Sequence, residues 1–309
     1  MSDTTASLRR KINSAGDLQS VVRTMKSLAA SSIGQYENSV RALADYYRTV
    51  EQGLGACFRD SKPEILIVAG KAQSDPGSIG AVVFGSDQGL VGRFNEVVVD
   101  HALATLITLP RNLQILAVGE RVHARLTDAG LPPERIFAVP SSVKAISPLV
   151  GQILVECETH DNQGAPAELY LFYNRPTSGA VYAPASLRLL PLDDDWRRKL
   201  TDLPWPTRNL PEIMGGGAET LGALVREYLF VSLFRACAES LASENASRLA
   251  AMERADRNID ELLEDLHGKF HRLRQSGIDE ELFDVISGYE ALAKGKAPRN
   301  TTQEHSEKP

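Results

Sequence analysis

The one stretch of this sequence whose residue types could bind a phosphate is the glycine-rich run from Gly85 to Gly92, which follows the apolar segment 79–84. Glycines placed after a strand can bring backbone N–H groups to an anion at the start of the next helix. The run reads GSDQGLVG, which lacks the spacing G-x-G-x-x-G, and the chain contains no G-x-x-x-x-G-K-[ST] motif. We therefore interpret it as a tight turn from a strand into a helix, with Asp87 capping or bracing the backbone.

Other residue types with catalytic or metal-binding potential occur without the spacing that such chemistry needs. His267 and His271 are four residues apart and could present two imidazoles on one helix face, but no Glu follows His267, so the metalloprotease pattern is absent. Solvated positions on a helix surface are the ordinary environment of such histidines. No serine lies in a G-x-S-x-G nucleophile elbow. We therefore expect no catalytic site, no metal and no cofactor.

The cysteines and the acidic run are equally uninformative about chemistry. Cys57, Cys157 and Cys237 are odd in number and widely spaced, which fits neither a disulfide framework nor a zinc site and indicates buried thiols in a reducing compartment. The run Asp193–Asp195, beside a tryptophan and three basic residues, is interpreted as a solvated edge.

Composition excludes two classes of protein. The 309 residues carry a formal charge of −6, and this acidic balance argues against a nucleic-acid-binding protein, which would show a basic footprint. No run of about 18 apolar residues occurs, so no direct membrane insertion is expected, and the polar N-terminus lacks the apolar core of a signal peptide. The chain is expected to be cytoplasmic.

The distribution of proline divides the chain into three parts that must position any functional residues. Fourteen of the sixteen prolines lie between Pro63 and Pro211, and none occurs before that range or in 218–297. Proline removes a backbone donor and clashes with the preceding helical turn, so its absence permits long helices. The sequence therefore predicts an N-terminal helix over 1–58, a central domain over 63–211, a C-terminal helix over 215–293 and a polar, disordered tail over 294–309.

Both terminal segments carry an apolar stripe with an average spacing of 3.5 residues, which is typical of a left-handed coiled coil. Because the two segments belong to the ends of one chain, we expect them to pair with each other in antiparallel orientation. Gly268, Gly277 and Gly288 weaken the second helix by up to about 1 kcal/mol each, so breaks are expected there if anywhere. The two stripes comprise Leu8, Ile12, Ala15, Gln19, Val22, Lys26, Ala29, Ile33, Tyr36, Val40, Leu43, Tyr47, Val50 and Leu54 in the first helix, and Leu224, Val231, Phe234, Ala238, Leu241, Asn245, Met252, Ala255, Ile259, Leu262, Leu266 and Leu273 in the second.

In the central domain, short apolar runs alternate with helical stretches. Strands are predicted over 79–84, 113–118, 135–139, 169–173 and 180–190, and helices over 94–106, 120–129 and 148–158. Such alternation predicts right-handed crossovers and a largely parallel sheet, while the last two strands are close enough to form a hairpin. The fold class predicted is α/β: a long antiparallel coiled coil of the N- and C-terminal helices plus a central doubly wound, largely parallel α/β domain.

Three motifs together resemble the gamma subunit of F-type ATP synthases, in the order in which that family has them. They are LRRKINS (8–14) with TMKSLAAS (24–31), SDQGLVGRFN (86–95), and ESLASENASRLAAM (239–252) continuing to RLRQ (272–275). The resemblance spans nearly the whole chain. It implies a non-catalytic rotor shaft that couples ion flow through the membrane ring to the catalytic beta subunits, with alpha, beta and epsilon subunits and the c-ring as partners, at the cytoplasmic face of the bacterial plasma membrane.

The resemblance also implies roles for individual residues. Met25 and Lys26 match the segment that faces a moving lever of a beta subunit, Arg248 matches an arginine facing the same region, and Arg274 with Gln275 match a pair that hydrogen-bonds a beta-subunit loop. An arginine can hold a carboxylate with two hydrogen bonds, which suits such a contact. The matching turn in the central domain has Asp87, Gly89, Gly92 and Asn95 as its family residues.

The match is imperfect, and two other interpretations remain open. Ser32-Ile33 and Arg93-Phe94 replace the usual family residues, which suggests a diverged paralogue from an alternate ion-translocating ATPase operon. The chain could instead be a nucleotide-using α/β enzyme with a helical oligomerisation arm, for which the loop Gly85 to Gly92 is the discriminating feature. It could also be a coiled-coil adaptor unrelated to ATPases. The coupled ion, the direction of catalysis and the role of the tail are not encoded in any motif.

Overall fold

The computed structural model describes residues 4–60, 79–109, 113–159, 168–178, 181–209, 211–213 and 217–294. Within these ranges the chain divides into two compact units, one formed by Met1–Arg23 with Arg254–Pro309 and the other by Thr24–Glu253. The predicted tail lies outside the described residues apart from Lys294, which ends the last helix.

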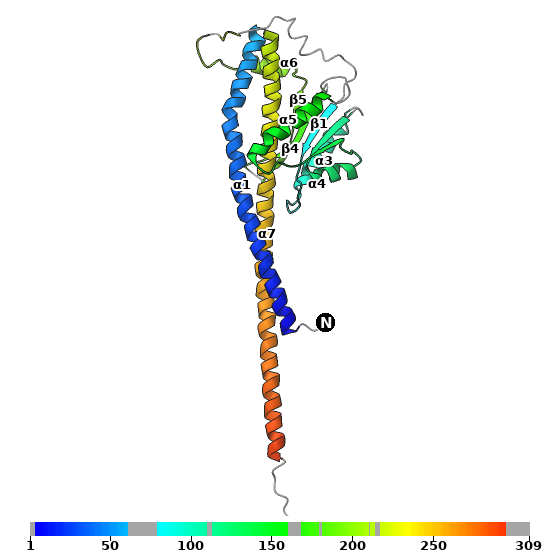
Figure 1. The fold of residues 1–309 in the computed structure, drawn as a ribbon, viewed down its shortest axis with the longest axis vertical. Helices are drawn as coiled ribbons and strands as arrows, with labels where there is room; N and C mark the ends of the chain where they lie inside the picture. Colours follow the sequence, from blue (N-terminus) through cyan, green and yellow to red (C-terminus); the bar gives the residue numbers. More distant parts are fainter. Residues whose placement is uncertain are drawn as a thin grey trace, which may run out of the picture. The chain divides into compact units, whose positions relative to one another are not determined.

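The two proline-free ends form the two long helices that were predicted (Figure 1). Helix α1 spans Thr5–Asp60 with 56 residues, and helix α7 spans Gly217–Lys294 with 78 residues. The three glycines named as potential breaks do not interrupt α7. A side chain at any of the three would meet open space, and the cost of each glycine, about 1 kcal/mol, is too small to end a helix that continues on both sides.

In the first unit, α1 and α7 pair through a mostly apolar seam with one polar layer. Leu8, Ala15 and Val22 are buried on α1, and Ile259 and Leu266 are buried on α7. At Gln19 the seam becomes polar, and its amide nitrogen donates to Asp256 at 3.3 Å and to Asp260 at 2.5 Å. A polar group in a coiled-coil seam selects one register at some cost in stability.

The prediction was wrong for one seam residue, Leu262. Leu262 is 48% exposed, whereas its neighbour Leu263 is partly buried. Steps of three and of four residues from Ile259 both stay near one helix face, so the sequence pattern does not choose between the two leucines. In the structure the partly buried residue of the two is Leu263.

In the second unit, the remaining parts of the two helices also pair in antiparallel order. The rings of Tyr47 and Tyr228 lie 5.9 Å apart, and the Arg235 guanidinium lies 5.9 Å from the Tyr47 ring. Further along α1, a side chain added at Gly53 would lie 3.3 Å from Leu224. Contacts therefore move toward the start of α7 as α1 proceeds, which confirms the antiparallel arrangement within this unit.

A five-stranded sheet forms the centre of the α/β domain, with the strand order β3-β2-β1-β4-β5. The pairs β1–β2, β1–β4 and β2–β3 are parallel, and β4–β5 is antiparallel. The sheet is therefore largely parallel with one hairpin, as predicted. The strands are β1 Ile79–Phe84, β2 Leu113–Val118, β3 Arg135–Phe137, β4 Glu168–Arg175 and β5 Ala183–Leu190.

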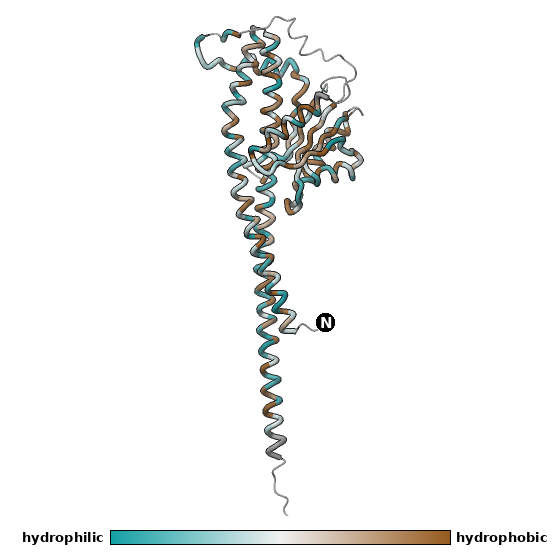
Figure 2. Tube along the Cα trace, viewed as in Figure 1, coloured by the Kyte–Doolittle hydropathy of each residue, from teal (hydrophilic) through white to brown (hydrophobic). Residues whose placement is uncertain are grey.

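Both faces of the sheet are covered, which explains why its central strand β1 is continuously apolar (Figure 2). On one face Ala81 and Val83 of β1 pack with α3 (Phe94–Leu106) and α4 (Glu120–Asp128). On the other face Val82 and Phe84 share a core with α5 (Val143–Thr159) and with residues of α1 and α7. The coiled coil thus completes the core of the domain within this unit.

One local prediction, the start of helix α5, was wrong. Helix α5 begins five residues before Pro148, which lies inside it; Ile146 and Val150 on the two sides of the proline are fully buried, and this apolar burial offsets the missing backbone hydrogen bond. The run Asp193–Asp195 is solvated, as interpreted, since Asp194 and Asp195 expose 79% and 77% of their side chains. It also starts helix α6 (Asp194–Thr201), because the Asp193 carboxylate accepts a hydrogen bond from the backbone N–H of Trp196 at 2.8 Å.

Replacing Gly85 by alanine tests the close packing between β1 and α4. The new Cβ would lie 2.4 Å from Val122 Cβ, and Val122 is fully buried, so we expect a loss of about 1–3 kcal/mol in the free energy of unfolding. Gly151→Ala in α5 is the matched control, because the added Cβ meets open space. This substitution should raise the free energy of unfolding by about 0.5–1 kcal/mol. Urea unfolding measures both; equal effects of the two substitutions would contradict this packing.

Candidate functional site

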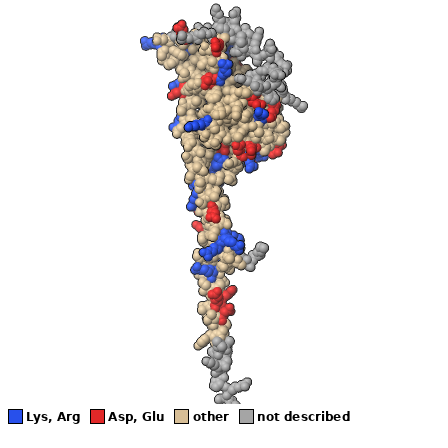
Figure 3. Space-filling view, viewed as in Figure 1, with Lys and Arg blue, Asp and Glu red and all other residues tan. Residues whose placement is uncertain are grey.

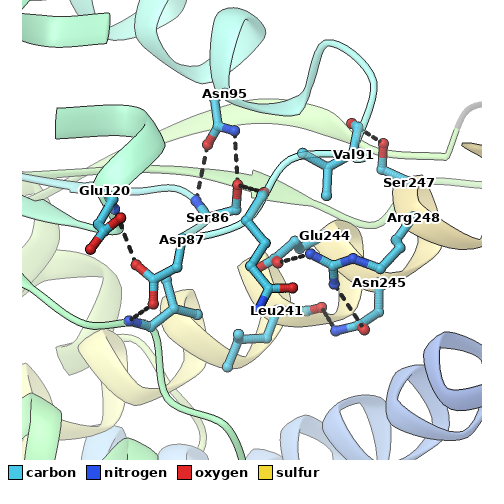
Figure 4. A network of polar contacts seen from close by, with 12 residues as sticks. Ser86, Asp87, Val91, Asn95, Glu120, Leu241, Glu244, Asn245, Ser247 and Arg248 are labelled. Atoms are coloured by element: carbon cyan, nitrogen blue, oxygen red, sulfur yellow. Dashed lines mark hydrogen bonds and ion pairs between the residues drawn. The ribbon is translucent and has the colours of Figure 1, made fainter. Parts of the chain in front are cut away.

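The turn that follows β1 is closed by its own side chains and does not form an open phosphate loop (Figure 4). The Ser86 N–H donates to Asn95 Oδ1 at 2.9 Å, and Asn95 Nδ2 donates to Ser86 Oγ at 2.8 Å. The Ser86 hydroxyl in turn donates to the Gln88 carbonyl at 2.9 Å. The Ser86 N–H is therefore already used, and the geometry favours the structural turn over the nucleotide-binding interpretation.

Asp87 braces this turn against two other segments, as predicted. Its carboxylate accepts hydrogen bonds from the Glu120 N–H at 3.1 Å and from the Val139 N–H at 2.9 Å. The first bond satisfies a free N–H in the first turn of α4, and the second holds the segment after β3. One carboxylate thus ties together the regions that follow three strands.

The two predicted glycines of the turn differ in what they contribute. Gly92 has φ of 57°, a left-handed conformation that glycine adopts without strain. Leu90 has φ of 63° and is 61% exposed, so this turn also holds a non-glycine residue in the left-handed region. A side chain at Gly89 would meet only the Arg121 guanidinium, at 3.8 Å, so no steric requirement for glycine exists at that position.

Two serines one turn apart on α7 connect the long helix to this α/β domain. The Ser247 hydroxyl donates to the Val91 carbonyl in the turn at 2.5 Å, and the Ser243 hydroxyl donates to the Asn174 carbonyl near the end of β4 at 3.0 Å. Asn174 Nδ2 donates to the Phe94 carbonyl at 2.9 Å, which links β4 to the start of α3. Ser243 and Asn174 are fully buried. We call these contacts, with the pair Glu244–Arg248, the junction.

The ion pair of the junction lies on the same stretch of α7, where Glu244 directly follows Ser243 and Arg248 directly follows Ser247. Arg248 Nη2 is 2.6 Å from Glu244 Oε1, and Arg248 Nη1 donates to Asn245 Oδ1 at 3.4 Å. The Arg248 side chain is only 14% exposed and that of Glu244 only 7%. Burial raises the pKa of Glu244, the Arg248 guanidinium opposes this rise, and the carboxylate of Asp87 adds to it. Arg248 thus uses its guanidinium within the chain.

The remaining predicted contact residues lie outside the junction. Met25 and Lys26 are partly buried on α1. Arg274 and Gln275 are exposed on the part of α7 that belongs to the other unit. Sequence reasoning did not identify Ser243, Ser247 or Asn174. A signal for the two serines was available, because they lie four residues apart in a helical run that also contains alanines. Small side chains at such spacing indicate that another backbone approaches the helix closely.

The chemistry of the junction is that of a structural connection. Its carboxylates and hydroxyls are bonded to backbone groups or to one guanidinium, and no group of three His, Cys, Asp or Glu residues that could hold a metal occurs within the described ranges. The cysteines are free and buried. Basic and acidic side chains are interspersed on the face in Figure 3, without a continuous basic surface. No helix in the described part of the chain is long and apolar enough to cross a bilayer. These features define an α/β domain that is anchored to a pair of long terminal helices.

Comparison with known proteins agrees with this class. A family model described as ATP synthase matches residues 4–292. ATP synthase gamma chains from Syntrophus aciditrophicus and Magnetococcus marinus are 28% and 26% identical, over 93% and 92% of this chain and 98% and 97% of the relatives. The chain belongs to the ATP synthase family, as one of its gamma chains.

Solved structures share the fold. A chain of the Euglena gracilis mitochondrial ATP synthase aligns with a TM-score of 0.66 at 18% identity, over 97% of this chain and 99% of that chain. A chain from the Tetrahymena thermophila central stalk and c-ring aligns with a TM-score of 0.53 at 21% identity, over 76% of this chain and 99% of that one. The fold class predicted from the sequence is confirmed.

Ser243→Ala tests whether the hydroxyl anchors the helix to the domain. The substitution leaves the buried Asn174 carbonyl without this donor, so the free energy of unfolding should fall by about 1–3 kcal/mol. Ser276→Ala, at an exposed position of the same helix, is the matched control and should change stability by less than about 0.5 kcal/mol. Chemical denaturation followed by circular dichroism makes the comparison, and equal stabilities of the two variants would show that the bond contributes nothing.

Glu244→Gln tests the protonation of the buried carboxyl. A pKa raised in the folded state means that the folded chain binds more protons than the unfolded chain above the ordinary value of 4.5. The contribution of Glu244 to stability is therefore present at low pH and is lost as pH rises through the raised pKa. The free energy of unfolding of the variant minus that of the wild type should increase from pH 4.5 upward. Denaturant titrations at several pH values measure this difference, and a decrease would contradict the assignment.

Proposed function

We propose that this chain is the central rotor shaft of an F-type ATP synthase, coupling ion flow through the membrane ring to conformational cycling of the catalytic beta subunits. The observation that carries the proposal is family membership over residues 4–292, together with two long terminal helices that pair with each other in each unit. A shaft can drive a partner only through contacts that differ between the partner's states.

The last turns of α7 supply a surface suited to such contacts. Ile278, Leu282, Val285 and Tyr289 recur at helical spacing and are between 54% and 75% exposed. An apolar stripe of large side chains on a helix surface is typical of a helix that docks against another protein. We assign this stripe to the alpha and beta subunits of the catalytic hexamer.

The predicted contact residues keep their assignments as proposals. Arg274 and Gln275 are exposed just before the stripe, where they can reach a beta-subunit loop. Met25 and Lys26 are assigned to the lever of a beta subunit. Arg248 also stays assigned to a beta subunit, although it exposes only 14% of its side chain and its guanidinium is held by Glu244 and Asn245.

The same proposal covers catalysis and location. We assign the chain a non-catalytic role. The glycine-rich turn supports this, because the Ser86 N–H and the Asp87 carboxylate are both hydrogen-bonded within the chain. The epsilon subunit and the c-ring are proposed as partners of the α/β domain, and the complex is placed peripherally on the cytoplasmic face of a bacterial plasma membrane. Family membership excludes an adaptor unrelated to ATPases.

Reconstitution tests the rotor assignment. The purified chain should hydrolyse no ATP alone, and a complex assembled with its alpha, beta, epsilon and membrane subunits should pump ions only when the chain is present. Ion-coupled hydrolysis of full magnitude in a complex that lacks this chain would overturn the proposal.

Arg274→Ala tests the contact near the end of α7. Loss of an exposed arginine should leave the free energy of unfolding within about 0.5 kcal/mol of the wild type, while ATP-driven pumping falls because a charge-assisted contact to the partner is lost. Arg257→Ala, at another exposed position of α7, is the control and should pump normally. Pumping and hydrolysis rates measured on the same vesicles separate coupling from assembly. Unchanged pumping by the Arg274 variant removes this residue from the partner surface.

A further inference from the structure

Two histidines one turn apart on α7 belong neither to the junction nor to the assigned partner contacts. His267 and His271 are both exposed, and they lie in the unit formed by Met1–Arg23 with Arg254–Pro309. Residues four apart in a helix share one face. Here the two imidazoles are also stacked on each other, with ring centroids 6.5 Å apart and planes inclined by 26°.

Neither imidazole is used by another polar group. His267 and His271 have no hydrogen bond and no ion pair within the residues that the structure describes. The Phe270 ring meets the His271 ring edge to face at 5.9 Å, which leaves the ring nitrogens unused. Lys269, which lies between the histidines in sequence, donates to Asp265 at 2.6 Å. A lone pair on each neutral ring is therefore available to a ligand.

A divalent transition metal ion is the ligand that suits two such rings. Imidazole nitrogen is a preferred ligand of zinc, copper and nickel ions, whereas Mg²⁺ and Ca²⁺ prefer oxygen. A Zn–N bond is about 2.0–2.1 Å long, so two rings on one ion have centres roughly 5 Å apart. The observed 6.5 Å requires the rings to approach by roughly 1–2 Å, and exposed side chains make such movements by rotation within nanoseconds.

The pair lies across a weak point of the long helix. Gly268 lies between the two histidines, and glycine inside a helix costs about 1 kcal/mol relative to alanine. Leu266 is the last buried residue of α7 among those whose burial is described, so tertiary packing supports the following turns less. An ion held by both rings connects two successive turns across this glycine.

We propose that His267 and His271 together bind one Zn²⁺ ion, with one nitrogen from each ring and water in the remaining positions. Structural zinc sites have four protein ligands and catalytic sites have three. This site has two, in agreement with the absence of any three-ligand group from the described part of the chain, so its ion exchanges with solution. Because the ion binds the pair only in the helical form, its binding stabilises this stretch of α7.

Isothermal titration of Zn²⁺ into the purified full chain, prepared without a polyhistidine tag, tests the site. One saturable event with a dissociation constant below about 1 mM is expected, and Mg²⁺ should give none. His267→Ala and His271→Ala should each weaken Zn²⁺ binding by at least about tenfold, because either variant leaves a single imidazole. His123→Ala, which removes a histidine from α4, is the control and should leave the affinity unchanged.

A second control keeps the number of histidines and changes only their spacing. Combining His271→Ala with Arg272→His retains all six histidines of the chain but moves the second ring about 100° around the helix. Arg272 is exposed, so circular dichroism should show an unchanged fold. The Zn²⁺ affinity of this double variant should equal that of His271→Ala, because the two rings no longer share a face with His267.

Amide hydrogen exchange locates the ion on α7. With Zn²⁺ at about ten times its dissociation constant, amides of residues 268–275 should exchange about tenfold more slowly, and those of α4 should not change. Four results would overturn the site: no saturable Zn²⁺ binding up to about 1 mM; equal affinity for Mg²⁺; wild-type affinity in both single variants of the pair or in the double variant; or unchanged exchange over 268–275. None of these readouts involves pumping, so their failure leaves the rotor assignment standing.

Discussion

The structure depends on one constraint: buried backbone carbonyls of the α/β domain must find donors, and the long C-terminal helix supplies them. Ser243 donates to the Asn174 carbonyl near the end of β4, and Ser247 donates to the Val91 carbonyl in the turn after β1. Because a buried carbonyl without a donor is costly, the position of the helix against the domain is set by hydrogen bonds in addition to apolar packing. The Asp87 carboxylate likewise accepts hydrogen bonds from backbone N–H groups of two further segments, at the start of α4 and after β3.

The same helix meets three environments along its length, and its composition changes accordingly. Where it passes between α1 and the sheet it is buried nearly all round, so that even Ser240 and Glu244 are inaccessible. Past Met252 only one stripe is buried, against the first turns of α1. Beyond Leu273 its large apolar side chains are exposed. The buried part of the helix can serve as domain core, the half-buried part as a coiled-coil partner, and the exposed part as a docking surface. A rotor shaft requires all three.

Periodicity identified the elements but not the polar contacts between them. The absence of proline and the stripe of apolar residues predicted α1 and α7 nearly to their ends, and strand–helix alternation predicted the parallel sheet with its terminal hairpin. The start of α5 was wrong because tertiary burial of Ile146 stabilises a turn that Pro148 alone would disfavour. Asp87 was predicted correctly, since a carboxylate in a strand-to-helix turn has local N–H groups to cap. Ser243 was missed, because its acceptor lies 69 residues away in the chain.

Local pattern therefore determined what each segment becomes: helices where proline is missing, strands where short apolar runs end in turns, and a family identity where three motifs occur in order. Only the tertiary structure decided which faces of those elements meet. It placed Arg248 against Glu244, buried Leu263 in part while leaving Leu262 exposed, and set the Ser243 hydroxyl against the Asn174 carbonyl. The reason is physical: secondary structure follows from constraints within a few residues, whereas the partner of a buried polar group is set by which distant segments are packed beside it.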